Sequence, residues 1–275
     1  MKEPAALRVV KFSVITVIAL FCALPFVWVV ITAFKSPQDF FTAGRILPSS
    51  FYFGNFKDVW VNARFFKYFL NSAFLSTGTT AVCVVLSIMA CYGFCRFKII
   101  GKNFILLAIL FTQMFPSVLL ALPYYRTLQS VKLIDTLLGL GITYTSFTLP
   151  FCIWTMMGYF NNLPWELAEA AAIDGCTRFQ TVYKIIIPIA APGIAATGLY
   201  AFIKAWDEFM YANIFINTTS KRTLQIGIHS LIGEYTTDWG MLMAGAVISC
   251  IPVIILFSFI QKNLVQGLAA GSVKG

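Results

Sequence analysis

Long apolar runs, separated by short polar segments, dominate the hydrophobic pattern of this chain. Six of them have about 18 residues or more, the length that a helix needs to cross the hydrocarbon core of a bilayer. The runs are Phe12–Phe34, Phe69–Tyr92, Phe104–Tyr124, Leu137–Phe160, Ile189–Ile216 and Met241–Ile260. The pattern therefore predicts an all-α integral membrane protein with six transmembrane helices, which together form one transmembrane domain over residues 1–275.

Composition supports a membrane protein and argues against a nucleic-acid-binding one. The chain of 275 residues is 59% hydrophobic and 11% charged, against about 25% charged residues in an ordinary soluble domain. Its net charge of +9 comes from lysines and arginines scattered over the polar segments, without a basic stripe or a nucleic-acid-binding motif. We therefore expect membrane lipid around the chain and no nucleic-acid partner.

The orientation of the helices follows only weakly from charge. An even number of crossings places both termini on one side of the membrane, but the lysines and arginines divide almost evenly between the two sides. Short loops carry most weight in the positive-inside rule. The short segment between the second and third runs holds Arg96, Lys98 and Lys102, which favours cytoplasmic termini.

Motifs of a built-in energy source or an enzymatic site are missing from the sequence. Gly101-Lys102 resembles the end of a phosphate-binding loop, but Arg96 stands where the first glycine belongs, and no nucleophile elbow or zinc-protease helix motif is present. We expect no catalytic residues and no cofactor bound by this chain. Cys91 and Cys95 share a helix face without companion ligands, so packing is expected there rather than a metal site.

The segment between the fourth and fifth runs, residues 161–188, has the local chemistry of two short helices joined by a sharp bend. Capping residues, a first-turn proline, a left-handed glycine and an exit proline mark their ends. These residues are Asn162, Pro164, Gly175, Thr177, Gln180 and Pro188. The hairpin can be a docking element that protrudes into the cytoplasm, and composition alone also allows an ordinary interfacial loop.

Residue spacing within this segment carries a resemblance to a known family. Glu169-Ala170-Ala171, three residues, Gly175, nine residues and then Ile185-Ile186-Ile187-Pro188 resembles the signature EAA-x3-G-x9-I-x-L-P of permease subunits of binding-protein-dependent ABC importers. Only Ile187 departs from it. The tail from Val265 to Gly275 is similar to the ending of the second permease subunit of maltose-type carbohydrate importers. The resemblance implies a type I ABC importer permease fold and import of a sugar, a di- or oligosaccharide.

The resemblance also implies a set of partners in a bacterial-type cytoplasmic membrane. They are a second, different permease subunit, two cytoplasmic ABC ATPase subunits that bind ATP and Mg, and an extracytoplasmic sugar-binding protein. The segment 161–188 would couple this chain to an ATPase subunit, and the tail at 262–275 would lie in the cytoplasm. The expected coupling residues are Glu166, Glu169, Ala170, Ala171, Asp174, Gly175 and Pro188.

Polar residues follow one side of the fifth apolar run. At 100° per residue the polar side chains lie on one arc of about 100°, and Leu199, Phe202 and Trp206 lie opposite. The polar residues are Thr197, Tyr200, Lys204, Asp207, Glu208 and Tyr211. Each charge facing lipid would cost about 2.5 to 3.5 kcal/mol, so these side chains should face protein or water.

Two interpretations of this polar stripe remain open at this point. It can line a wet pathway for the sugar, whose hydroxyls donate and accept hydrogen bonds. Alternatively, Lys204 pairs with Asp207 or Glu208 inside the protein and the stripe is structural. Rival functions are a permease for another solute, a structural membrane scaffold, and a secondary transporter that uses Asp207 and Glu208 as coupling carboxylates. Neither of the last two explains the segment 161–188.

Overall fold

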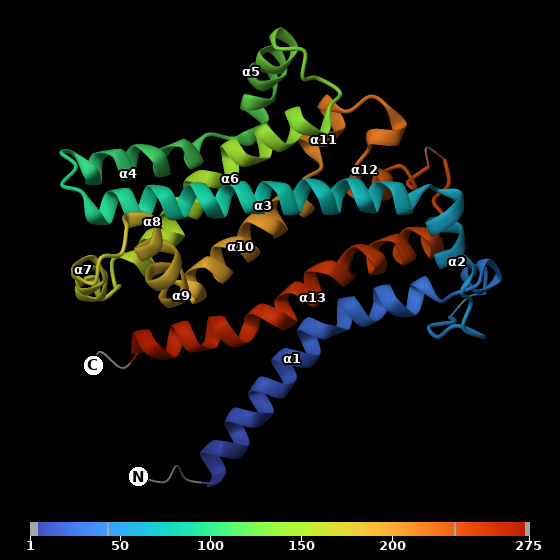
Figure 1. Ribbon diagram of the computed structural model, residues 1–275. Helices are drawn as coiled ribbons and strands as arrows, with labels where there is room; N and C mark the ends of the chain where they lie inside the picture. The colour runs from blue at the N-terminus through green and yellow to red at the C-terminus, as the bar shows by residue number, and fades with distance from the viewer. Residues whose placement is uncertain (1–4, 43, 234, 273–275) are drawn as a thin grey trace. The chain divides into compact units, whose positions relative to one another are not determined.

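The computed structural model describes residues 5–42, 44–233 and 235–272, and the regular structure within them is helical (Figure 1). Four long helices dominate: α1 (Ala5–Ala33), α3 (Phe65–Arg96), α6 (Leu137–Phe160) and α13 (Trp239–Ser272). The shorter helices are α2 (Gly54–Lys57), α4 (Lys102–Phe111), α5 (Ser117–Ser130), α7 (Trp165–Ile173), α8 (Arg178–Thr181), α9 (Ile187–Ile189), α10 (Ala191–Trp206), α11 (Met210–Phe215) and α12 (Leu224–His229). The all-α class predicted from the hydrophobic pattern is confirmed.

Four helices among the described residues are long and apolar enough to cross a membrane without interruption, in α1, α3, α6 and α13. Two further spans arise only if a bent pair of helices counts as one span, which gives up to six. The predicted run Leu137–Phe160 coincides with α6. The third and fifth predicted runs are broken, and the sequence pattern did not anticipate either break.

Proline accounts for the break in the third run and for the bend at the start of the fifth. In the third run Phe115 has extended backbone angles, because Pro116 disfavours the helical conformation of the residue before it and offers no N–H. The two halves, Lys102–Met114 and Ser117–Ser130, meet at 98°. In the fifth run Pro188 and Pro192 flank a break at Ala190, with a π-helical turn before it, and the halves meet at 81°. The continuous helix expected over Ile189–Ile216 also ends early, at Trp206.

The described chain forms two compact units. The first comprises Met1–Phe66 with Gly227–Ile251. In it the ring of Phe34 contacts those of Phe51, Phe53 and Phe56. The amide nitrogen of buried Asn55 donates to the carbonyls of Ala33 and Lys35, at 2.9 Å each, and so closes the end of α1.

The second unit comprises Lys67–Ile226 with Pro252–Gly275 and holds the residues of functional interest. Within it α10 packs along α6. One buried cluster, around Tyr144 and Phe215, lies toward the N-terminal end of α6, and another, around Met156 and Phe160, lies toward its C-terminal end. Side chains from residue 262 onward lie outside the described residues, so the expected tail at 262–275 stays a prediction.

Candidate functional site

The segment 161–188, which we call the docking segment, begins with α7. Its N-cap is Pro164, with no side-chain cap. Asn162, expected to cap, instead donates its amide to the carbonyl of Gly158 at 2.8 Å. Glu166 stands in the first turn, where the positive end of the helix favours a carboxylate.

The bend after α7 has the geometry expected for its glycine. Gly175 has a φ of +82°, a conformation that a residue with a Cβ adopts only under strain. The N–H of Cys176 bonds the carbonyl of Ala171 at 2.9 Å, and the N–H of Gly175 bonds that of Ala172 at 3.2 Å. Together these bonds form a Schellman motif, which satisfies the last carbonyls of the helix. The left-handed bend predicted at Gly175 is confirmed.

A second predicted feature, the capping box before α8, is also present. The N–H of Gln180 bonds the hydroxyl of Thr177 at 3.3 Å, and the N–H of Thr177 bonds the side-chain oxygen of Gln180 at 2.8 Å. Two sharply bounded short helices therefore follow each other, as the local sequence indicated.

The docking segment has a buried side and an exposed side. Ala168 and Ala171 are buried. Their small side chains allow α7 to lie close to the helices that it packs against. The other proposed coupling residues are exposed: Glu166, Glu169, Ala170, Asp174, Gly175 and Pro188. Ile173, Phe179 and Tyr183 are large exposed hydrophobics of the same segment. Large exposed apolar side chains beside polar ones are typical of a surface that contacts another protein or the membrane.

Glu169 already has a partner inside the chain, which the sequence did not reveal. Arg96 Nη1, at the C-terminal end of α3, lies 3.2 Å from Glu169 Oε1. The glutamate side chain nevertheless remains 61% exposed, and its other oxygen has no partner within the part of the chain that the structure describes. The sequence indicates only the charge of Arg96, because 73 residues separate it from Glu169 and no short-range pattern links them.

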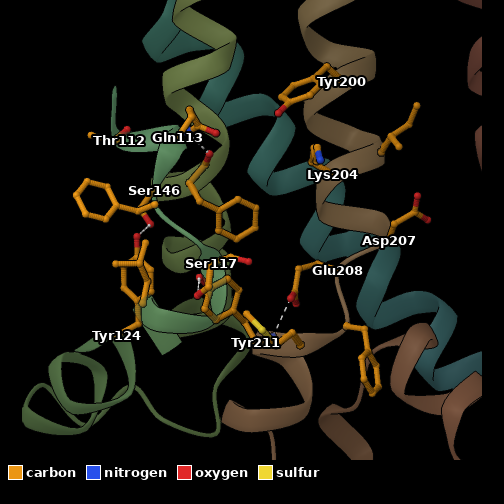
Figure 2. Close-up of a pocket in the computed structure, with 16 residues that line it drawn as sticks. Thr112, Gln113, Ser117, Tyr124, Ser146, Tyr200, Lys204, Asp207, Glu208 and Tyr211 are labelled. Carbon is orange, nitrogen blue, oxygen red and sulfur yellow. Dashed lines mark hydrogen bonds between the residues drawn. The ribbon is translucent and has the colours of Figure 1, made fainter. Parts of the chain in front are cut away.

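A cavity of about 610 Å³ lies among the 3-10 turn Thr112–Met114, α5, α6, α10 and the start of α11 (Figure 2). Five of the six residues predicted to lie on the substrate pathway line it: Tyr200, Lys204, Asp207, Glu208 and Tyr211. Thr197 does not reach it and is completely buried elsewhere. Residues outside the predicted polar stripe also line it, including Gln113, Ser117, Tyr124 and Ser146.

The two charged residues nearest the end of α10 face the cavity separately. Lys204 and Asp207 are both exposed, and within the described residues no ion pair joins Lys204 to Asp207 or Glu208. The Lys204 nitrogen lies 5.8 Å from the ring centre of Tyr200. The structural pair that the sequence left open is therefore not formed, and the cation and the Asp207 carboxylate remain available to a ligand.

Glu208 has a different role from its neighbour. Its Oε1 accepts the N–H of Tyr211 at 2.7 Å, and its Oε2 accepts the N–H of Ala212 at 3.1 Å and the hydroxyl of Tyr144 at 2.6 Å. Figure 2 shows the carboxylate turned toward Tyr211. Because the helix is interrupted at residues 207–209, Glu208 caps the following helix and fastens it to α6. Helical periodicity alone places Glu208 in the polar stripe and does not indicate this capping role.

Hydroxyl groups and aromatic rings make up much of the remaining wall. Tyr211 donates its hydroxyl to the carbonyl of Ser117 at 2.8 Å, and Ser146 bonds the hydroxyl of Tyr124 at 2.8 Å. The rings of Tyr124 and Tyr211 meet edge to face. Such a wall offers both donors and acceptors beside flat apolar faces, which suits a solute with many hydroxyl groups.

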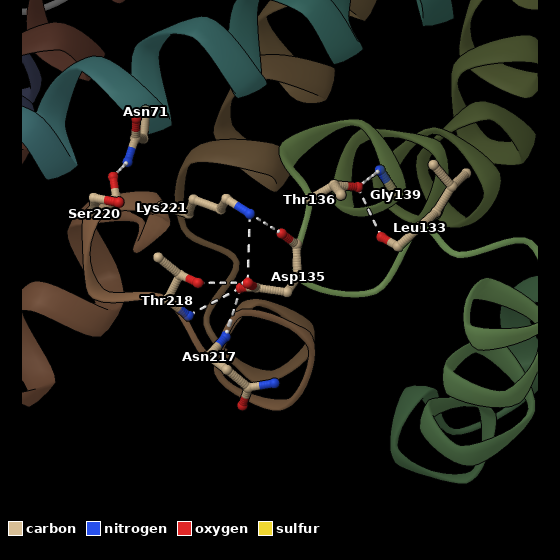
Figure 3. Close-up of polar contacts among 9 residues, drawn as sticks. All are labelled: Asn71, Leu133, Asp135, Thr136, Gly139, Asn217, Thr218, Ser220 and Lys221. Atoms are coloured by element: carbon tan, nitrogen blue, oxygen red, sulfur yellow. Dashed lines mark hydrogen bonds and ion pairs between the residues drawn. The ribbon is translucent and has the colours of Figure 1, made fainter.

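A second polar cluster fixes the loop between α11 and α12 (Figure 3). Asp135 accepts the N–H groups of Asn217 and Thr218, at 2.9 Å each, and the hydroxyl of Thr218, and it pairs with Lys221 at 3.4 Å. Partial burial alone would raise the pKa of Asp135, but these hydrogen bonds outweigh it and lower the pKa to about 2. The cluster is therefore ionised and intact at neutral pH, and it is lost only as the pH falls from about 4 through 2.

Sequence comparison places these features in a known family. The profile of the family described as "Binding-protein-dependent transport system inner membrane component" matches residues 84–270, which include the docking segment and the cavity. The Probable ABC transporter permease protein YurM of Bacillus subtilis is 38% identical over 253 residues, 92% of this chain and 84% of that protein. The Trehalose/maltose transport system permease protein MalG of Thermococcus litoralis is 32% identical over 278 residues, 100% of each chain.

A further relative agrees with this assignment, and a solved structure shares the fold. The Trehalose transport system permease protein SugB of Mycobacterium tuberculosis is 32% identical over 262 residues, 94% of this chain and 95% of that protein. A chain of a bacterial ABC transporter involved in the import of alginate shares the fold, with a TM-score of 0.80 at 21% identity, over 95% of this chain and 99% of that one. The resemblance inferred from the signature is confirmed: the chain belongs to the family of inner membrane components of binding-protein-dependent transport systems.

Proposed function

We propose that this chain is one membrane-spanning subunit of an ATP-driven importer that passes a sugar, a di- or oligosaccharide, across the cytoplasmic membrane. The docking segment is the observation that carries the proposal, because it presents Glu169, Ala170 and Gly175 of the family's signature on an exposed surface. The sugar is supported by the polar, aromatic cavity and by relatives named for trehalose and maltose transport.

Energy for transport comes from outside the chain in this proposal. ATP and Mg bind to two partner ATPase subunits in the cytoplasm, and the docking segment of this chain contacts one of them. Glu169 offers its second oxygen to a basic residue of the ATPase, while Ile173 and Phe179, which are 88% and 79% exposed, supply apolar contact area. A charged centre with apolar flanks gives both orientation and affinity.

The remaining partners are a second, different permease subunit and an extracytoplasmic sugar-binding protein. A related alginate transporter was crystallised together with a pentasaccharide-bound periplasmic protein, which supports delivery of the solute by a separate protein. A permease for a non-sugar solute is the nearest alternative. An ion-coupled secondary transporter would need no docking segment, so that alternative explains less of the structure.

Reconstitution tests the proposed function directly. Proteoliposomes that contain this chain with its partner permease and ATPase subunits are expected to take up radiolabelled disaccharide only with binding protein and with MgATP on the cytoplasmic face. A panel of trehalose, maltose and a non-sugar solute of similar size identifies the class. Uptake that needs an ion gradient and persists without the ATPase would contradict the proposal.

Orientation follows from the same assignment, with the docking segment and both termini in the cytoplasm. A single cysteine at Thr177, in a chain cleared of native cysteines, is expected to resist a membrane-impermeant maleimide in intact cells and to react in inverted vesicles. Thr177 is exposed, so protection in intact cells reports the membrane rather than burial. Labelling from the outside would reverse the topology and separate this segment from any cytoplasmic ATPase.

A further inference from the structure

One end of α3 is fastened to the docking segment by three different contacts. Besides the ion pair between Arg96 and Glu169, the ring of Tyr92 lies 6.2 Å from that of Trp165. Just beyond the helix, the Arg178 guanidinium stands over the ring of Phe97, 5.5 Å from its centre. These contacts reach α7 and the start of α8. A displacement of the docking segment therefore acts on the end of α3.

The other end of α3 holds the loop between α11 and α12. The amide nitrogen of Asn71 donates to the carbonyl of Ser220 at 3.0 Å and to that of Arg222 at 2.9 Å. The Ser72 hydroxyl accepts the N–H of Leu224 at 2.8 Å. Asn71 and Ser72 are only 7% and 3% exposed, so water competes little with these bonds, and Figure 3 shows Asn71 directed at the loop that Asp135 also fixes.

Between these two ends α3 is stiff and long enough to cross the membrane. The 25 helical steps from Asn71 to Arg96 span about 38 Å at 1.5 Å per residue, more than the roughly 30 Å of the hydrocarbon core. Of the four uninterrupted spans in the described chain, α3 alone lacks an internal proline, whereas α1, α6 and α13 contain Pro25, Pro150 and Pro252. Proline is the common cause of helix kinks.

We propose that α3 is the mechanical link between the docking segment and the loop 216–224 on the opposite side of the membrane, with Arg96 and Asn71 as its positioning residues. This inference rests on the proposed function, because it takes the docking segment to be the surface that an ATPase moves. Closure of the ATPase pair shifts α7, α7 shifts the end of α3 through Arg96 and Tyr92, and Asn71 and Ser72 pass the shift to the loop.

Hydrogen exchange on the whole complex tests the link without knowledge of the sugar. Peptides covering residues 217–224 are followed in the complex without nucleotide and after trapping with MgATP and orthovanadate. We expect trapping to change their exchange in the unaltered complex, Asn71→Ala to lose most of that change and Arg96→Gln to lose part of it. Arg96→Lys should retain more of the change than Arg96→Gln, because lysine keeps the positive charge. Lys98→Gln removes an exposed charge from the same short segment and should leave the response intact.

The amount of ATPase that co-purifies with each variant distinguishes failure of the proposed link from failure of the proposed function. If Arg96→Gln retains the ATPase and its loop still responds as in the unaltered complex, α3 is not the link. The same conclusion follows if trapping leaves residues 217–224 unchanged in the unaltered complex. If the ATPase does not associate with the unaltered chain, the docking proposal itself fails, and this inference fails with it.

Discussion

Glu169→Lys is expected to abolish ATP-driven uptake while the chain still inserts in the membrane. Glu169 is 61% exposed and its ion pair with Arg96 lies at the surface, where such pairs contribute about 0 to 1 kcal/mol. Folding should therefore change little. At the proposed interface, however, the lysine would face a basic residue of the ATPase, and like charges at an interface cost several kcal/mol. Uptake should fall on the order of 100-fold or more.

The measurement is uptake by proteoliposomes together with the amount of ATPase that co-purifies. Glu169→Gln, which removes the charge without reversing it, should lie between the unaltered chain and the lysine variant. A double variant, Glu169→Lys with Arg96→Glu, restores an ion pair within the chain but leaves the repulsion with the ATPase. It should therefore remain inactive. Normal uptake by the single variant, or full rescue by the double variant, would show that Glu169 acts only within this chain.

Glu208→Ala is expected to give much less folded chain and assembled complex. The substitution removes the acceptor for the N–H groups of Tyr211 and Ala212 and for the hydroxyl of Tyr144, and Tyr144 is completely buried. An unsatisfied buried donor costs about 1 to 3 kcal/mol, so the loss of the acceptor for three donors should cost about 3 to 9 kcal/mol. Complex yield and the midpoint of thermal unfolding in detergent measure it. Tyr144→Phe, which removes one donor, should have a smaller effect.

The neighbouring carboxylate provides a matched control. Asp207 faces the cavity, and its side chain has no hydrogen-bond partner among the described residues, so Asp207→Ala should assemble normally and lose sugar-stimulated ATP hydrolysis. Adding Lys204→Met to it should not improve the yield, since no pair is broken. Normal yield of Glu208→Ala would contradict its positioning role. If Asp207→Ala gives a poor yield that Lys204→Met restores, the result would support a structural pair between Lys204 and Asp207.

Local sequence signals determined those parts of the chain whose causes lie within a few residues. Apolar runs indicated the approximate places of the four uninterrupted spans and of the two bent pairs, because helix length and hydrophobicity are what a bilayer selects. The ends of α7 and α8 followed from Gly175 and from Thr177 with Gln180, since caps and left-handed turns are formed by neighbours in sequence. The family signature lies in the same segment and was confirmed by comparison.

Tertiary structure decided what depends on contacts between distant residues or on breaks in a helix. Pro116 bends the third predicted run, because a hydropathy average over a window does not register one missing N–H. The helix of the fifth run ends at Trp206, where no proline marks the break. After the break at Trp206, Glu208 caps α11 while it still lines the cavity, and the packing of α6 beside α10 and the turn Thr112–Met114 adds Ser146 and Gln113 to the cavity wall. The contact of Arg96 with Glu169 had no sequence signal, because packing of α3 beside α7 depends on the whole fold.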